Sequence, residues 1–302
     1  RILGISAEAG MGKSRLLAEF ARAAETRSVV VALGECQSYG TNISYFVWRE
    51  IWAMLFHLDD KLQEDEQLRA LDVQLAGIDP ALVPRAPLLG GLLDLPIPDN
   101  DLTAAFDAKL RKTSLEALLV ECLRACATEV PLLVVLEDCH WLDPLSRDLL
   151  EVLARAAAGL SVLLVLAYRP STSVGGGLGL ENLPHFDEIA LAELDGEHAA
   201  QLIRSKLAQM SGAEIAAPAA LIELVTARAQ GNPFYLEELH NFIRSQGVDP
   251  QDESALKALE LPESLHSLIL SRIDKLAEAP RRTLKVASVL GRVFRAPMLP
   301  GV

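Results

Sequence analysis

Short apolar runs alternate with longer amphipathic stretches up to about residue 194. The apolar runs cover residues 2–5, 29–33, 132–136 and 162–167, and a last short one lies around residues 189–191. Runs of this length that are apolar without alternation are typical of parallel strands with both faces buried. The stretches between them repeat apolar residues at helical spacing. The pattern therefore predicts an α/β fold, with a parallel sheet flanked by helices.

From residue 195 onward the spacing is only helical. Leu202, Ile203 and Leu207 define one helix, and a later one stops at Gly231-Asn232-Pro233. A glycine at a helix end followed by proline is general stop chemistry and carries no function alone. Another helix follows Pro262. We predict an α/β domain over residues 1–194, an all-helical domain over 195–258 and an incomplete third domain over 259–302.

The connection between the second and third predicted strands is long and varied. Its acidic run at residues 59–66 indicates a solvated surface, whereas the aromatic residues at 46–52 are more typical of a core than of a ligand cage. Residues 79–98 contain several prolines among leucines, which predicts short helical turns in an insertion that still buries its leucines. A long helix is expected over residues 105–128, and Gly175–Gly177 mark a mobile loop.

Composition and charge exclude some classes of function for this segment. The chain has 302 residues, half of them apolar in the broad count, with 5% aromatic residues and a formal net charge of −13. It thus lacks the basic field that would hold nucleic acid or an anionic membrane. No apolar run reaches the roughly 18 residues that cross a bilayer. We expect no direct binding of nucleic acid and no membrane association by these residues.

The cysteines indicate a reducing compartment. Cys36, Cys122, Cys126 and Cys139 form no C-x-x-C pair and are too few for a disulfide framework in a chain of this size. We interpret them as small buried residues, although Cys122 and Cys126 have the spacing of neighbours on a helix. A cytoplasmic location is the expectation. Because Arg1 lies inside the first predicted strand, we expect that the natural N-terminus is missing, and the lack of a signal peptide is weak support for this location.

Candidate chemistry begins directly after the first apolar run, at Ala7-Glu8-Ala9-Gly10-Met11-Gly12-Lys13-Ser14. The pattern G-x-x-x-x-G-K-[ST] curls the backbone so that N–H groups converge on phosphate, while Lys neutralises charge and the hydroxyl binds Mg²⁺. Ala7 replaces the first glycine and is allowed there if its φ is negative. An ordinary glycine turn is the alternative. The sequence of strand, loop and helix favours a phosphate-binding loop.

Carboxylates and an arginine follow two later strands. Glu137 and Asp138 come directly after the most apolar run, where one carboxylate can support Mg²⁺ and the other can orient or deprotonate a water. Without the loop, this pair would be interpreted as a solvated strand end. Arg169 follows the next strand and could reach a γ-phosphate, although a surface arginine is the alternative. Asp143 and Pro144 predict the start of a helix.

The order of these motifs resembles the STAND-type signalling ATPases of the AAA+ branch. It is most similar to bacterial ATPase modules joined to class III adenylate/guanylate cyclase domains or to LuxR-type regulators. The similarity covers nearly the whole chain. It is carried by a phosphate loop (Walker A) running into Arg15-Leu16-Leu17, a Walker B region at 134–143, a sensor at Tyr168-Arg169-Pro170, a lid motif at 231–239 and a winged-helix start at Leu261–Leu265 and Gly291–Phe294.

The resemblance implies roles for individual residues. ATP or ADP would be held by loop residues Ala9, Gly10, Met11, Gly12, Lys13, Ser14 and Arg15, and Pro233 would lie against adenine from a lid. Ser14 and Glu137 would hold Mg²⁺, Asp138 would act on water, and Arg169 would sense the γ-phosphate. A Gly-Arg motif that family members carry upstream is not contained in the sequence, and Glu137 stands where other P-loop enzymes have Asp, although this branch often has Glu-Asp.

The expected function is that of a slow, Mg²⁺-dependent ATPase that acts as a switch in a larger signalling protein. Its partners would be ATP and neighbouring domains of the same polypeptide, such as a cyclase or a DNA-binding output domain. Two alternatives stay open at this point. One is a scaffold module that binds ATP or ADP without hydrolysis, and the other is a subunit of an AAA+ motor ring with an arginine supplied in trans.

Overall fold

The computed structural model describes residues 1–59, 61–170, 178–211, 219–247, 253–259, 261–262, 264–274 and 276–290. Contacts group the chain into two compact units. The first consists of Arg1–Ala9 and Lys13–Leu191, and the second of Gly10–Gly12 and Ala192–Val302. The predicted loop at Gly175–Gly177 and the motif at Gly291–Phe294 lie outside the described residues.

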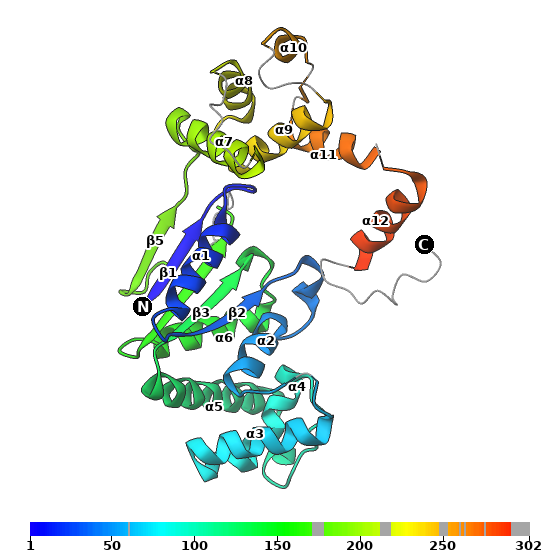
Figure 1. Ribbon diagram of the computed structural model, residues 1–302. Coiled ribbons are helices and arrows are strands. Elements are labelled where there is room, and N and C mark those ends of the chain that lie inside the picture. Colours follow the sequence, from blue (N-terminus) through cyan, green and yellow to red (C-terminus); the bar gives the residue numbers. More distant parts are fainter. Residues whose placement is uncertain are drawn as a thin grey trace. The chain divides into compact units, whose positions relative to one another are not determined.

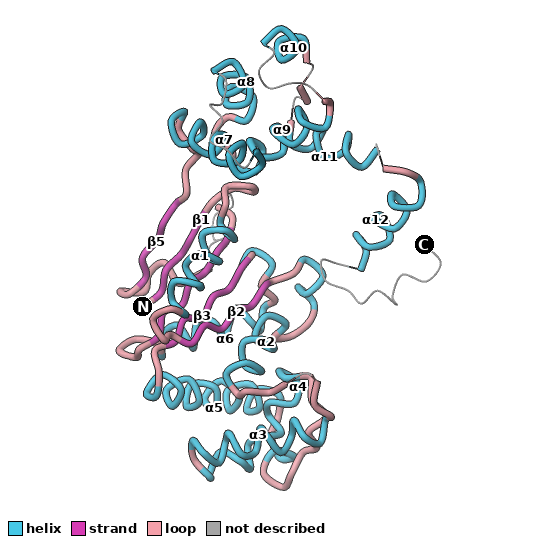
Figure 2. The backbone as a smooth tube through the Cα atoms, in the orientation of Figure 1, coloured by secondary structure: helices cyan, strands magenta, loops and turns pink. Residues whose placement is uncertain are grey.

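The first unit is built on a parallel sheet, as its apolar runs predict (Figures 1 and 2). Every pairing is parallel, and the strand order is β2-β3-β4-β1-β5. β1 and β3, the strands that precede the two main candidate motifs, are therefore both neighbours of β4. The strands are β1 (Ile2–Ser6), β2 (Val30–Glu35), β3 (Leu132–Glu137), β4 (Val162–Tyr168) and β5 (Phe186–Ala190).

The two faces of the sheet have cores of different size. Leu132, Val134 and Leu136 of β3 belong to the large core, which also contains residues of α2 (Phe46–Leu55), α5 (Ala108–Glu129) and α6 (Pro144–Ala156). Leu133 and Val135 point to the smaller core, which contains Leu17 and Ala24 of α1 (Lys13–Glu25). Burial of alternate residues on opposite faces explains why β3 is apolar throughout. Trp48 and Trp52 are both buried in the large core, which confirms their expected place.

A helical insertion joins α2 to α5. Its leucines at positions 82, 88, 89, 92 and 93 are buried in the large core, as predicted. The described residues of the acidic run, Asp59 and residues 61–66, are exposed, although the last of them begin a helix that the acidic pattern alone does not indicate. The elements between β2 and α5 are η1 (Ser38–Asn42), α2, α3 (Glu64–Ile78), η2 (Pro80–Leu89), α4 (Gly90–Leu93) and η3 (Thr103–Ala105).

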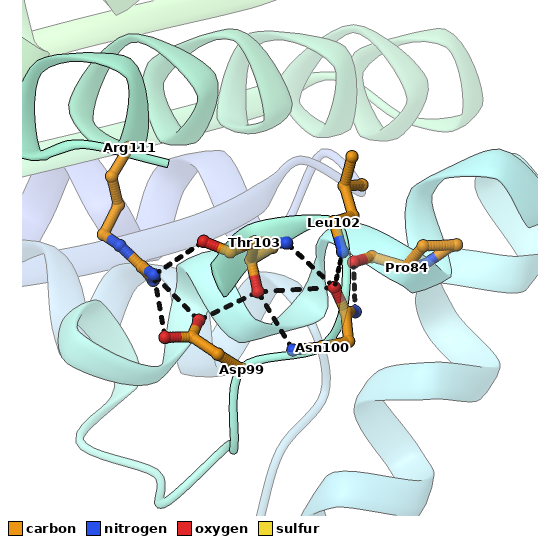
Figure 3. Close-up of polar contacts among 6 residues, drawn as sticks. All are labelled: Pro84, Asp99, Asn100, Leu102, Thr103 and Arg111. Carbon is orange, nitrogen blue, oxygen red and sulfur yellow. Dashed lines mark hydrogen bonds and ion pairs between the residues drawn. The ribbon is translucent and has the colours of Figure 1, made fainter. Parts of the chain in front are cut away.

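A network of polar contacts ties the turn at residues 99–103 to η2 and α5 (Figure 3). Asn100 Nδ2 donates to the carbonyl oxygen of Pro84 at 2.7 Å, and Asn100 Oδ1 accepts from the backbone N–H groups of Leu102 and Thr103, both at 3.0 Å. One guanidinium nitrogen of Arg111 lies 2.8 and 2.9 Å from the two carboxylate oxygens of Asp99. This ion pair and a hydrogen bond from Thr103 hold the pKa of Asp99 below its usual value. The turn is thus held mainly by side chains.

The start of α5 differs from the prediction. The helix begins at Ala108 and not at Ala105, because Asp107 accepts a hydrogen bond from the backbone N–H of Leu110 at 2.7 Å and caps the first turn. Leu110, which the spacing assigns to the apolar stripe, is 47% exposed. The buried stripe therefore starts five residues later, at Leu115.

The second unit contains only helices among its described residues, in agreement with the prediction. Its core includes Ile203, Leu221, Val225, Leu236 and Leu239. Apart from Gly10–Gly12, this unit begins at Ala192. The domain boundaries at 195 and 259 and the winged-helix start remain predictions. The helices are α7 (Gly196–Ser211), α8 (Ala219–Ala229), α9 (Pro233–Ser245), α10 (Glu253–Ala258), α11 (Leu265–Asp274) and α12 (Glu278–Leu290).

All four thiols are free. Cys36, Cys122 and Cys139 are buried and Cys126 is half-buried, which confirms their interpretation as small residues of the core. None of the helices in the described part of the chain has the length and apolarity needed to cross a bilayer.

Candidate functional site

The loop between β1 and α1 has the backbone that its glycines require. Gly10 and Gly12 have φ of +82° and +88°, in the left-handed region that favours glycine. Ala7 is not among the described non-glycine residues with positive φ, so a methyl group is tolerated where the usual pattern has glycine. Ala7 is also 2% exposed, and its backbone N–H donates to the carbonyl oxygen of Tyr168 at 3.2 Å. The substitution therefore leaves the geometry of the loop intact.

Lys13 is the first residue of α1 and is only 9% exposed. Its Nζ donates to the carbonyl oxygens of Ala7 and Glu8, at 2.6 and 3.0 Å. Burial lowers the pKa of Lys13, the carboxylate of Asp138 opposes this effect, and Arg169 adds to it. The ammonium group is thus fixed beside the loop and lies within electrostatic range of two later candidate residues.

The end of β3 turns sharply. Glu137 is the last residue of the strand and pairs with Glu35 of β2. Asp138 has φ 53° and ψ 39°, a left-handed conformation that costs a non-glycine residue free energy. A 3₁₀ turn, η4 (Cys139–Trp141), follows, and the backbone N–H of Trp141 donates to the carbonyl oxygen of Asp138 at 2.9 Å. Of the two adjacent acids, Glu137 therefore ends the strand and Asp138 begins the turn.

Arg169 follows β4 and is exposed. Its charge acts on Lys13 and also on His140, a residue that the motif analysis did not single out as functional. His140 lies in the turn after Asp138, with 3.9 Å between its Nδ1 and Asp138 Oδ1. Burial is the main cause of the lowered pKa of His140. The charge of Asp138 raises this pKa, and the charges of Arg169 and Lys13 lower it further. The structure thus brings together Lys13, Asp138, Arg169 and His140; the signal for His140 was its place two residues after the acidic pair.

A magnesium ion would depend on few protein ligands. In the part of the chain that the structure describes, no cluster of three or more His, Cys, Asp or Glu side chains could hold a metal. Ser14 is exposed in the first turn of α1, and Glu137 is half-buried at the strand end. One hydroxyl and one carboxylate match the way in which Mg²⁺ is held together with water and substrate phosphates. The residues present therefore fit the expected ion.

The remaining predicted ligands are placed as follows. Ala9 and Arg15 are exposed, and Met11 is 9% exposed. Pro233 is half-buried as the first residue of α9, in the second unit. The structure describes Pro233 within that unit and leaves its contact with adenine a prediction.

Asn232 has a role that was not predicted. Its Oδ1 accepts from the backbone N–H of Tyr235 at 3.1 Å and so caps α9. Within the second unit, which includes Gly10–Gly12, the backbone N–H of Phe234 donates to the carbonyl oxygen of Gly10 at 3.2 Å. A β-carbon at Gly10 would lie 2.7 Å from Asn232 Oδ1. The Gly-Asn-Pro motif therefore does more than end a helix.

Asp143 starts α6, as predicted. Its Oδ1 accepts from the backbone N–H of Ser146 at 2.9 Å, and Pro144 occupies the first helical position. The same oxygen accepts from the backbone N–H of Tyr45 at 3.3 Å, so a residue that is 4% exposed also fixes the start of α2. The role of Asp143 is structural in this geometry.

Comparison with known proteins identifies a family for the first part of the chain. Residues 1–165 match the family described as AAA ATPase domain. A search of curated proteins found an uncharacterized protein of Rhizobium meliloti (strain 1021) that is 28% identical over 306 residues, which is 98% of this chain and 28% of that protein. The chain therefore spans less than a third of the length of this relative.

Two solved structures match nearly the whole chain at low sequence identity. A Signal Transduction ATPase with Numerous Domains (STAND) protein with a tetratricopeptide repeat sensor, from Pyrococcus horikoshii, is 16% identical with a TM-score of 0.49, over 98% of this chain and 33% of that one. The ORC1 protein of Aeropyrum pernix, solved in complex with DNA, is 14% identical with a TM-score of 0.38, over 97% and 73%.

Proposed function

Because the chain belongs to the AAA ATPase domain family, we propose that it binds ATP with Mg²⁺ and hydrolyses it slowly, as a switch within a larger protein. The observation that carries this proposal is the meeting of Lys13, Asp138 and Arg169, whose charges act on one another or on a common neighbour. These residues follow β1, β3 and β4, whose carboxyl ends lie side by side at one edge of a parallel sheet. This edge is where open α/β sheets bind ligands.

Each residue has a distinct part in the proposed reaction. Loop N–H groups and Lys13 bind the phosphates, and Arg169 neutralises charge on the γ-phosphate. Asp138 orients or deprotonates a water for in-line attack on the γ-phosphorus, after which ADP leaves. Ser14 and Glu137 would hold Mg²⁺, which supplies positive charge to the phosphate oxygens.

The proposed switch is supported by the contacts of the loop after β1. Gly10–Gly12 belong by contacts to the second unit, and Phe234 bonds to Gly10 there. We infer that bound nucleotide changes the conformation of this loop segment and that Pro233 lies against adenine. The length of the curated relative supports a place in a larger protein. An output domain of the cyclase or DNA-binding type and a cytoplasmic location are part of the proposal.

Calorimetric titration with ATP and Mg²⁺ tests the binding site. Lys13→Ala should lower the affinity at least about tenfold, which corresponds to roughly 1.4 kcal/mol, because a buried cation beside the phosphates is removed. Lys109→Ala, at an exposed position of α5, is the matched control and should bind like wild type. Equal affinities of Lys13→Ala and wild type would refute the site.

Phosphate release tests hydrolysis separately. Asp138→Asn should abolish release while ATP still binds, and Asp101→Asn, at an exposed position, should behave like wild type. Equal release by Asp138→Asn and wild type would favour a scaffold that binds nucleotide without turnover. Assembly into a ring with ATP, measured by light scattering, would instead favour the motor alternative.

A further inference from the structure

We propose that His140 is a positioning residue for Asp138, to which it donates a hydrogen bond from Nδ1 in the arrangement that hydrolyses ATP. The inference rests on the proposed function and deepens it. It assigns a task to a side chain that no motif role explains and that lies beside the water-activating carboxylate.

The first observation is an unsatisfied ring. The side chain of His140 is 20% exposed, yet both of its ring nitrogens are buried and lack a hydrogen-bond partner among the described residues. A neutral imidazole always carries one N–H donor. A buried donor without an acceptor is costly and is rare in native structures. The ring therefore needs a partner in at least one functional state.

The second observation is which partner is within reach. Three charged groups act on His140: Asp138, Arg169 and Lys13. The two cations cannot accept a hydrogen bond, whereas the carboxylate can. Nδ1 and Asp138 Oδ1 are 3.9 Å apart, which is too long for a hydrogen bond but makes the carboxylate a direct neighbour of the ring. Asp138 is therefore the acceptor that the site provides.

The third observation is that the turn holds the two groups together. Asp138 adopts a left-handed conformation, and the 3₁₀ turn that contains His140 begins at the next residue. Cys139, which is fully buried, donates from Sγ to the carbonyl oxygen of Leu136 at 3.3 Å and anchors the turn. The ring of His140 also packs on that of Trp141, with 5.0 Å between centroids. These contacts restrict the ring to the neighbourhood of the carboxylate.

The hydrogen bond from His140 would fix the orientation of the Asp138 carboxylate and leave its charge unchanged. A carboxylate that accepts one bond from a fixed imidazole keeps its other oxygen in a defined orientation for the attacking water. The substrate phosphates are bound by other residues. Loss of this hydrogen bond should therefore slow hydrolysis and leave the affinity for ATP nearly unchanged.

Two amide substitutions test the geometry. His140→Asn places an N–H donor near the position of Nδ1, whereas His140→Gln places it near Nε2. We expect kcat to fall by about tenfold or more in His140→Gln, and clearly less in His140→Asn, with ATP affinity within about threefold of wild type in both. Equal kcat in the two variants, or a higher kcat in His140→Gln, would overturn the inference.

A second measurement does not depend on turnover. The affinity for ADP with aluminium fluoride, divided by that for ADP alone, reports how well the protein binds a mimic of the attacked phosphate. This ratio should fall in His140→Gln and stay near the wild-type value in His140→Asn. His198→Gln is the matched control, because His198 Nδ1 lies 2.8 Å from an aspartate, Asp195, at an exposed turn of the second unit. The control should change neither kcat nor the ratio.

The outcomes separate the two proposals. If wild type fails to bind ADP or ATP, the proposed function is wrong and this inference falls with it. If wild type binds both and the ratio is unchanged in His140→Gln, the inference alone is wrong. If the ratio falls in His140→Gln but not in His140→Asn, the positioning role is supported even for a protein with very slow turnover.

Discussion

Two turns at the carboxyl ends of parallel strands solve the same backbone problem in different ways. The loop after β1 uses glycine at both positions of positive φ, Gly10 and Gly12. The turn after β3 uses an aspartate, Asp138, at φ 53°. A left-handed conformation costs an L-residue roughly 1–2 kcal/mol, whereas glycine adopts it freely. The second turn therefore carries a strain that the first one avoids.

The difference follows from what each turn presents to a ligand. The loop presents backbone N–H groups, for which the absence of a side chain is an advantage. The turn after β3 presents a carboxylate, which a glycine could not supply. Strained residues persist where the surrounding structure fixes them, and they are common at functional sites. The strain at Asp138 thus supports the role that we propose for it.

The largest effect should come from adding a methyl group to the loop. Gly10→Ala would combine positive φ with a β-carbon 2.7 Å from Asn232 Oδ1, whereas a β-carbon at Gly12 meets nothing within 4 Å. We expect Gly12→Ala to lower the free energy of unfolding by about 1–2 kcal/mol, and Gly10→Ala by about 2–3 kcal/mol, in urea denaturation. Ala7→Gly, at negative φ, should cost less than about 1 kcal/mol. An equal loss at Gly10 and Gly12 would mean that Asn232 moves freely.

A substitution at Asp138 should change the stability in the opposite direction. Asp138→Gly should relieve the left-handed strain and raise the free energy of unfolding by up to about 1 kcal/mol, while phosphate release is lost. Asp138→Asn is the control, because asparagine tolerates this conformation and removes only the charge. Melting temperatures of the two variants and wild type measure the change. A less stable Asp138→Gly would show that contacts of the carboxylate outweigh the strain.

The sequence predicts the sheet and most of the site because both depend on local patterns. Continuous apolar runs indicate the strands, and a phosphate loop next to a helix start indicates Lys13. The left-handed conformation of Asp138 could not be predicted, because aspartate is found in many conformations and the apolar run before it does not distinguish them. His140 and Asn232 were missed for a related reason. The neighbours that matter for them, Asp138 for His140 and Gly10 for Asn232, come close only in the folded chain.

A third turn, in the insertion, offers a comparison without positive φ. No residue from Asp99 to Ala105 is among the described residues with positive φ, and Asn100 instead makes hydrogen bonds from both ends of its amide. Asn100→Ala should lower the free energy of unfolding by about 1–2 kcal/mol, since these bonds are lost together. Asp101→Ala, at the exposed neighbouring position, should be nearly neutral. Equal stabilities of Asn100→Ala and wild type would show that backbone geometry alone holds this turn.

A last prediction concerns the reactivity of the buried thiols. Cys139 is fully buried, and burial raises the pKa of its thiol, as it raises that of Cys122 to about 12. For Cys122, the rise from 9 to about 12 lowers the thiolate fraction at pH 8 by roughly a thousandfold, and the buried thiol of Cys139, whose pKa is raised as well, should likewise resist alkylation in the native protein. Half-buried Cys126 should be alkylated first, and all four cysteines should be alkylated in urea. Mass spectrometry of the alkylated protein measures both. Rapid native modification of Cys139 would show instead that the turn after β3 opens as readily as a glycine loop.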